Sequence, residues 1–190
     1  MLHQIIKENT HAAHQKAEGI IVRRLKNIRT YQNYAEVLKL FYAYFKAVEM
    51  AVAPFITTAV LPDIDERRNS SYLKKDIESL GYWSEELPTL DAPIVTNVVE
   101  ALASLYVLEG SIMGGPYIVK MLNNSGITQG TTFFEGYGEK SEYMWTIFTN
   151  TLNEYGKEVK THARAVEIAI ETFHKFGEAF SAPRDVSVSQ

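Results

Sequence analysis

The chain has 190 residues, of which 46% are hydrophobic and 22% charged, and its formal net charge is −4 at pH 7. This composition is typical of a globular protein, and the acidic balance gives no reason to expect nucleic acid as a partner. Cysteine is absent from the sequence, which excludes disulfides, thiolate metal sites and a cysteine nucleophile.

The N-terminal segment, MLHQIIKENTH, lacks the apolar stretch of a signal peptide. No apolar run approaches the roughly 18 residues that cross a bilayer. We therefore expect a soluble, cytoplasmic protein with no membrane partner. The length favours one domain with a sizeable core.

Hydrophobic residues recur with helical spacing along the chain, whereas strand-like alternation is nearly absent, so an all-α fold is predicted. A first helix is expected from Leu2 to about Gly19, and a second from Thr30, a good N-cap, to just before Pro54. Further helices are expected over about 63–80, 91–111, 141–155 and 161–180. Together these elements predict a single helical domain over 1–181 and a flexible C-terminal tail over 182–190.

Three glycines interrupt an apolar segment, YVLEGSIMGGPYIV, and each costs a helix about 1 kcal/mol relative to alanine. Gly110 and Gly114 are four residues apart and share one helical face, which Gly115 widens. Pro116 lacks an N–H, so the helix should kink or restart near Gly115. The bare backbone has two explanations at this point, close packing against another helix or contact with a flat ligand.

His14 lies at the border between the apolar stripe and the polar face of the first helix, between the small residues Thr10 and Ala17. A neutral imidazole there could ligate iron, and Lys7, two turns earlier on the same side, could reach an anionic edge of a ligand. A surface histidine beside a surface lysine explains the same pattern, so both interpretations stay open.

A second metal hypothesis comes from two Glu-x-x-His spacings, Glu8 with His11 and Glu171 with His174. Such pairs are part of the signature of ferritin-like di-iron bundles. However, both glutamates are turned away from the apolar faces of their helices, whereas ligands of a buried site must point inward. A di-iron oxidase is therefore the weaker alternative.

Several segments, taken in their order along the chain, resemble the bacterial haem oxygenases, particularly those associated with bacteriophytochromes. THAAHQKAE resembles the family's proximal helix, LKLFYAYFKAVE its long second helix and LYVLEGSIMGG its distal helix, while FFEGYG followed by Trp145 and Phe148 is similar to a further block of the bacteriophytochrome-linked group. The resemblance covers most of the chain, about 5–180. It implies a single-domain helical bundle with a kinked distal helix.

The resemblance also implies an activity. Haem, acting as both substrate and cofactor, would be opened to biliverdin with release of carbon monoxide and ferrous iron. The reaction would need O2 and a separate electron donor such as a ferredoxin, a flavodoxin or a reductase, and a bacteriophytochrome is a candidate acceptor of the biliverdin. A non-catalytic haem-binding or haem-trafficking protein is the alternative with the same binding residues.

Particular residues take roles through this resemblance. His14 corresponds to the histidine that ligates the haem iron, and Lys7 to a lysine that meets a haem propionate. The remaining predicted haem contacts are Thr10, Ala17, Arg24 and Tyr106. The predicted catalytic segment, whose backbone would lie close to the site where dioxygen reacts, consists of Gly110, Ser111, Gly114 and Gly115.

Three residues depart from the family pattern. Ser111 stands where animal-type members carry an aspartate that organises water, although much of the bacterial subgroup shares the serine. Pro116 stands where relatives often have a polar or basic residue, and Met144 where the subgroup often has arginine. Because each change removes a possible water or propionate contact, haem binding is better supported than turnover.

Overall fold

The computed structural model describes residues 1–181, and within them the chain is helical without any strand. The α-helices are α1 (Leu2–Lys26), α2 (Tyr31–Val52), α3 (Ser70–Ser79), α4 (Val98–Gly110), α5 (Gly115–Asn124), α6 (Thr132–Glu135), α7 (Ser141–Tyr155) and α8 (His162–Ser181). Short 3-10 turns are η1 (Ile64–Glu66), η2 (Ser111–Gly114), η3 (Gly138–Lys140) and η4 (Val159–Thr161). The all-α class is confirmed, while the predicted tail over 182–190 lies outside the described residues.

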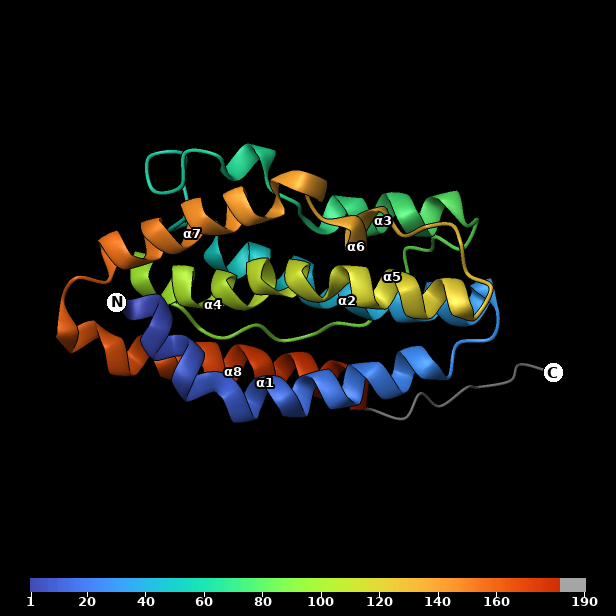
Figure 1. Ribbon diagram of the computed structural model, residues 1–190, viewed down its shortest axis with the longest axis horizontal. Coiled ribbons are helices and arrows are strands. Elements are labelled where there is room, and N and C mark those ends of the chain that lie inside the picture. The colour runs from blue at the N-terminus through green and yellow to red at the C-terminus, as the bar shows by residue number, and fades with distance from the viewer. Residues whose placement is uncertain (182–190) are drawn as a thin grey trace.

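The helices lie in three layers (Figure 1). One outer layer contains α1 and α8, the middle layer contains α2 and the line of α4 and α5, and the other outer layer contains α3, α6 and α7. α4 is the central element, because it packs on α2, α7 and α8 and is buried from Glu100 to Glu109. Its position leaves little of its length exposed until the chain reaches Gly110.

Some predicted boundaries are confirmed and others are wrong. Thr30 caps α2 as expected, since its side-chain oxygen accepts from the Asn33 N–H at 3.1 Å. Gly19 does not end the first helix, which continues to Lys26 because Ile21 and Leu25 extend its buried stripe. Burial of these apolar side chains in the bundle stabilises the helix by more than one glycine destabilises it.

Two further helices are shorter than predicted. The expected helix over 63–80 contains only η1 and α3, and the segment between them holds two buried arginines, Arg67 and Arg68. The helix expected from residue 91 begins at Val98, because Asn97 is its N-cap and accepts from the Glu100 N–H at 3.1 Å. The N-cap residue Asn97 therefore marks the start of α4, whereas the apolar pattern had placed the start about six residues too early.

The stretch Val98–Asn124, read as one segment, has the length and mean hydropathy (1.3) of a membrane span. This finding corrects the expectation that no such segment occurs. The mean hydropathy over many residues stays high even though the segment contains the charged residue Glu109. Within the bundle, 67% of that window is buried. The high hydropathy therefore reflects the central place of α4 in the core.

Candidate functional site

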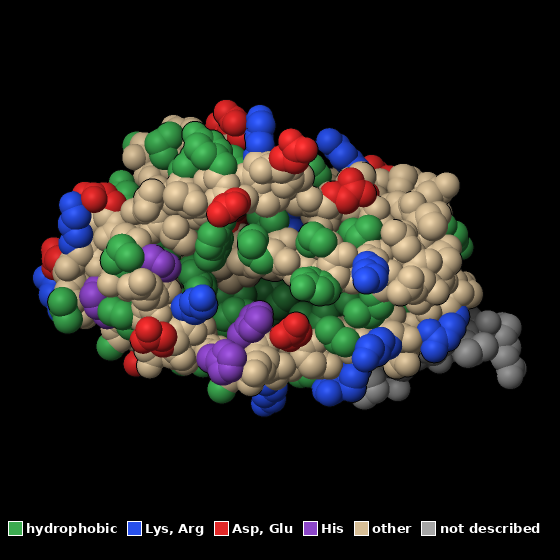
Figure 2. Space-filling view, viewed as in Figure 1, with side chains coloured by type: hydrophobic (Ala, Val, Ile, Leu, Met, Phe, Trp, Pro, Cys, Tyr) green, Lys and Arg blue, Asp and Glu red, His purple; other side chains and the backbone are tan. Residues whose placement is uncertain are grey.

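A hollow opens between α1 and the line of α4 and α5 on one face of the molecule (Figure 2). Hydrophobic side chains line its floor, and histidine and basic side chains stand along its border over α1. We call α1 the histidine wall, and α4, η2 and α5 together the glycine wall. Each wall contains one of the two groups of residues that the sequence singled out.

The histidine wall is held by close packing against α8. Gly177 of α8 lies directly against α1, since a Cβ there would come within 3.3 Å of Ile20 Cδ1 and 3.6 Å of the Ala17 Cα. The exposed ring of His14 meets Phe173 of α8 edge-on, with centroids 5.3 Å apart and planes at 73°. Within residues 1–181 no hydrogen bond engages its ring nitrogens, so they are available to a ligand.

The other predicted residues of this wall divide into two groups. Lys7 is exposed, seven residues before His14 and therefore on the same side of the helix. Thr10 and Ala17 are buried toward the bundle, and the Thr10 hydroxyl donates to the Ile6 carbonyl at 2.8 Å. The structure thus aligns Lys7 with His14, while Thr10 and Ala17 support the helix from beneath.

The glycine wall bends where the sequence predicted it. α4 ends at Gly110, η2 tightens the chain, and α5 begins at Gly115 with Pro116 in its first turn. The 3-10 geometry of η2 changes the hydrogen-bond register between the two helices. One apolar segment is therefore two helices joined by a short bend.

The three glycines of the bend have different surroundings. A Cβ added at Gly115 would overlap the carbonyl oxygen of Phe134, whereas one at Gly114 would find nothing within 4 Å. At Gly110 a Cβ would lie 3.5 Å from the ring of Trp145, an ordinary contact. Close packing therefore explains Gly115, and only Gly114 presents open backbone. The continuous bare strip that the spacing predicted is divided into separate parts.

A buried polar network lies beneath the bend, and Arg67 is at its centre. Its Nη1 contacts Glu109 Oε2 at 2.5 Å, its Nε and Nη2 donate to Asp63 at 2.9 and 2.7 Å, and Nη2 also donates to the Met144 carbonyl at 3.0 Å. Tyr137 donates its hydroxyl to Glu109 at 3.2 Å. Burial raises the pKa of the Glu109 carboxyl, although the charges of the neighbouring arginines act to lower it.

Arg68 contacts the bend itself. Its Nη2 donates to the Leu108 carbonyl at 3.0 Å and to the Ser111 hydroxyl at 2.8 Å, and its Nη1 donates to the Phe133 carbonyl at 3.1 Å. The guanidinium also lies 4.0 Å from the centre of the Phe133 ring. Burial lowers the pKa of Arg68 to about 10, against the opposing charge of Glu109. Sequence reasoning missed both arginines, because their segment was predicted only as part of a charged helix over about 63–80.

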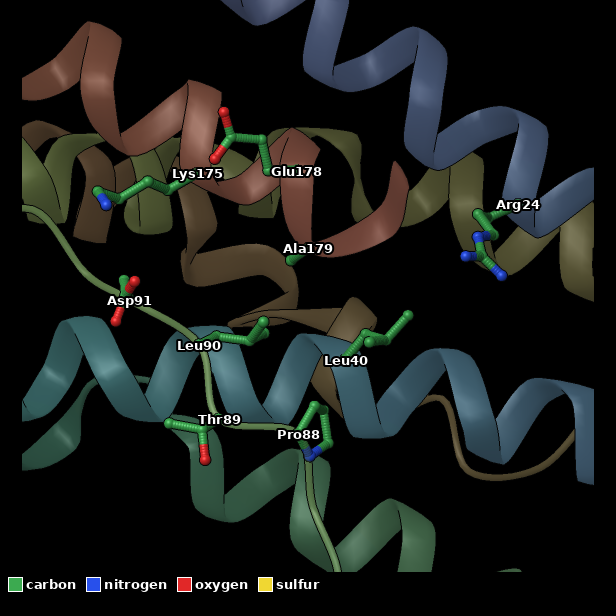
Figure 3. Close-up of a pocket in the computed structure, with 9 residues that line it drawn as sticks. All are labelled: Arg24, Leu40, Pro88, Thr89, Leu90, Asp91, Lys175, Glu178 and Ala179. Carbon is green, nitrogen blue, oxygen red and sulfur yellow. The ribbon is translucent and has the colours of Figure 1, made fainter. Parts of the chain in front are cut away.

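The two remaining predicted residues contact other parts of the molecule. Tyr106 is buried against Trp145 of α7, with ring centroids 5.2 Å apart. Arg24 donates from Nε to the Phe180 carbonyl at 2.8 Å and lines a pocket of about 290 Å³. That pocket is formed with α2, α8 and the segment over 88–91 (Figure 3). The structure therefore does not gather Arg24 and Tyr106 with Lys7 and His14.

The two Glu-x-x-His motifs do not form a metal centre. Glu8, His11 and His174 are exposed, and Glu171 lies 3.9 Å from Lys175 in an ion pair on its own helix. Across residues 1–181, no three histidine, aspartate or glutamate side chains are grouped so that they could hold a metal ion. This arrangement argues against the di-iron alternative.

The hollow lies between a helix that carries an exposed histidine and a bend that carries open backbone, and comparisons with known proteins identify the family of the chain. The heme oxygenase family model matches residues 1–182, so the chain belongs to the haem oxygenase family. The chain is 24% identical to a heme oxygenase of Xanthomonas campestris pv. campestris over 151 residues, which is 78% of this chain and 89% of the relative.

The fold is shared with a solved structure, the NO- and CO-bound heme oxygenase from Neisseria meningitidis. The TM-score is 0.76, with 97% of this chain and 94% of that chain covered at 20% identity. The family resemblance and the fold are thus confirmed. The protein is accordingly a haem-degrading enzyme that forms biliverdin, uses haem as substrate and prosthetic group, and requires O2 and a reductant.

Proposed function

We propose that the hollow between the two walls is the haem site and that His14 is the iron ligand. The observation that carries this proposal is an imidazole without a hydrogen bond on one wall and, at Gly114 on the other, backbone with open space where a side chain would project. The apolar floor of the hollow suits a porphyrin (Figure 2). A neutral imidazole is a common ligand of haem iron. The residues present therefore fit haem.

Each part of the site contributes differently to the reaction. Bound haem supplies the iron at which dioxygen is activated. His14 would ligate the iron, and the ammonium group of Lys7 would hold a propionate. Gly114 keeps a side chain out of the open space next to the bend, whereas a side chain at Gly110 would meet the ring of Trp145. The absence of an acid or base on that surface leaves main-chain groups and ordered water as the hydrogen-bond partners there.

Ser111 supports the bend rather than the reacting groups. Its hydroxyl donates to the Leu108 carbonyl at 2.6 Å and receives a hydrogen bond from Arg68. A hydroxyl has one proton to donate, and this one is used within the wall. The catalytic segment predicted from the sequence therefore divides into Gly114, with open space at its backbone, and Gly110, Ser111 and Gly115, which pack within the fold.

The need for an electron donor follows from the family, and the biliverdin acceptor is suggested by the similarity of FFEGYG, with Trp145 and Phe148, to a block of the bacteriophytochrome-linked group. We propose that electrons come from a ferredoxin, a flavodoxin or a reductase, and that carbon monoxide and ferrous iron are released with biliverdin. A bacteriophytochrome then takes up the biliverdin. The reaction takes place in the cytoplasm.

Hemin titration of His14→Ala tests the ligand assignment. We expect the wild type to give a Soret band, and His14→Ala to lose or strongly shift it. His11→Ala, which removes another exposed histidine one turn away, is the matched control and should give the wild-type spectrum. An unchanged spectrum for His14→Ala would remove His14 as the ligand.

Turnover separates an enzyme from a haem carrier. The titrated complex is supplied with ascorbate or a ferredoxin system, and biliverdin is followed by its absorbance. The proposal expects biliverdin from wild type and from His11→Ala, but little from His14→Ala. A wild-type Soret band that persists without biliverdin would support the non-catalytic alternative instead.

A further inference from the structure

We propose that Arg68 is a positioning residue that sets the bend of the glycine wall. Its effect on the bound ligand rests on the proposed function, because the ligand is haem only if that function is right. The bend itself is present in the protein without haem. The proposal can therefore be tested in two independent ways.

The bend needs support from outside its own helices. The change from α-helix to 3-10 geometry at η2 shifts the hydrogen-bond register and leaves carbonyls at the end of α4 without their usual partners. The Leu108 carbonyl keeps only a contact with the Ser111 N–H, three residues ahead, and it also receives the Ser111 hydroxyl at 2.6 Å and Arg68 Nη2 at 3.0 Å. Arg68 thus satisfies a backbone group at the point where the helix changes.

The same guanidinium reaches the other side of the bend. Its Nη1 donates to the carbonyl of Phe133 in α6, and the next carbonyl, that of Phe134, is the group that leaves no room for a Cβ at Gly115. Because α6 packs on the first turn of α5, one planar group connects the end of α4 to the support of α5. The fixed fork of arginine suits this double contact, and a lysine cannot reproduce it.

Stability alone does not account for this residue. Arg68 is 6% exposed, and among residues 1–181 no acidic side chain lies within salt-bridge distance of it. Its Nε is the one buried side-chain nitrogen or oxygen in residues 1–181 without a hydrogen-bond partner. A buried cation of this kind carries a desolvation penalty, and apolar replacements of buried ionic groups are often neutral or stabilising. We therefore infer that the role of Arg68 is to favour one backbone conformation of the bend.

Arg67 provides a matched control. It comes from the same segment, is 3% exposed and also carries a buried charge, but its contacts are with Glu109, Asp63 and the Met144 carbonyl. It donates no hydrogen bond to Leu108 or Ser111. Lysine substitutions at the two positions therefore make the same chemical change, and only one removes the contacts with the bend.

The first experiment measures amide hydrogen exchange of the protein without haem. We expect Arg68→Lys to accelerate exchange in the segment 108–115 by about tenfold, while Arg67→Lys leaves that segment within about twofold of wild type. Ser111→Ala, which removes one acceptor of Arg68, should act in the same direction as Arg68→Lys and more weakly. Equal exchange in the two lysine variants would overturn the proposal, as would faster exchange in Arg67→Lys alone.

The second experiment uses carbon monoxide as a probe of ferrous haem in the same variants. We expect the carbon monoxide stretching band to shift or split in Arg68→Lys and to stay at the wild-type position in Arg67→Lys, because the band reports the polar groups nearest the ligand. The same band in both variants would refute an effect of Arg68 on the ligand. Failure of the wild type to bind haem would refute the proposed function, and the exchange measurement would still decide the role of Arg68 in the bend.

Discussion

The two walls of the hollow are built in opposite ways. The histidine wall is one uninterrupted helix of 25 residues, held by apolar packing on α8, and its important group is a side chain. The glycine wall is broken by a bend and held from behind by buried arginines, and its important group is open backbone. The helix that bears His14 is supported by apolar packing on α8, whereas the bend is supported by buried charged side chains.

This difference follows from what each wall presents. A side chain can be aimed by a regular helix, because helical geometry fixes its direction. Backbone is open to a ligand only where glycine leaves side chains out. A glycine-rich segment makes few side-chain contacts, so its own residues do little to fix its conformation. The glycine wall therefore depends on groups from a distant segment: Arg68 contacts the bend itself, and Arg67 pairs with Glu109 in the last turn of α4.

The largest expected effect on the glycine wall is that of Gly115→Ala. The new Cβ would overlap the Phe134 carbonyl oxygen, and backbone cannot move aside as a flexible side chain can. We expect a loss of roughly 3 kcal/mol in the free energy of unfolding, measured by urea denaturation. A loss below about 0.5 kcal/mol would show that α6 does not pack rigidly on α5.

Gly114→Ala is the matched comparison, one residue away. Its backbone is right-handed helical, with φ of −84°, and a Cβ there has open space. We expect unchanged stability or a gain of up to about 1 kcal/mol. Because the methyl group would project beside the ligand, haem affinity should fall by about tenfold. Full retention of haem affinity would place Gly114 outside the haem site.

These glycines also show how far the sequence could be interpreted. Helical periodicity and the position of Pro116 predicted the fold class and the bend correctly. The spacing of the glycines could not separate Gly114 from Gly115, because the difference depends on a carbonyl about twenty residues further along the chain. Spacing describes one helix at a time, whereas close packing depends on which segment arrives opposite.

The buried arginines illustrate a second limit. Arg67 and Arg68 stand in a charged segment, DERRNS, and charge there predicts exposure. The one available signal was Asp63, four residues before Arg67, which is the spacing of an ion pair on a helix. That signal indicates a pair but cannot indicate its burial. The prediction for His14 needs no such information, because it rests on the position of the residue at the border of one amphipathic helix, which is a local property.

A smaller effect is expected on the histidine wall from Phe173→Leu. Leucine keeps most of the buried volume but loses the edge-on contact with the His14 ring. We expect a loss of about 1 kcal/mol in unfolding free energy and a broadened Soret band in the haem complex, because the ligand ring is less well oriented. The exchange of amides in the segment 108–115 should stay unchanged, since that segment belongs to the other wall.

Phe176→Leu is the control for that variant. Phe176 lies on the same helix and is equally buried, but its ring contacts are with Tyr44 and other aromatic residues rather than with His14. We expect it to destabilise the fold while leaving the Soret band sharp. If both leucine variants broadened the band alike, the contact between Phe173 and His14 would have no particular role.

The smallest expected effect is a pH dependence confined to the glycine wall. Burial raises the pKa of Glu109 above its ordinary value of 4.5, although Arg67 and Arg68 oppose the shift. The folded protein then binds more protons than the unfolded chain at pH values just above 4.5. The unfolding free energy contributed by Glu109 therefore falls as pH rises through that window and is constant above the raised pKa.

Glu109→Gln removes this proton while keeping the shape of the side chain, so urea denaturation of both proteins across the pH range isolates its contribution. We expect the stability of the wild type relative to Glu109→Gln to decrease as pH rises from 4.5. The opposite slope would mean that the arginines outweigh burial and hold the pKa of Glu109 below its ordinary value. The corresponding difference for Phe176→Leu, on the helix that supports the histidine wall, should not change with pH, because its ring contacts are with other aromatic residues and include no carboxylate. A slope in one wall and none in the other would separate a bend supported by charge from a helix supported by apolar packing.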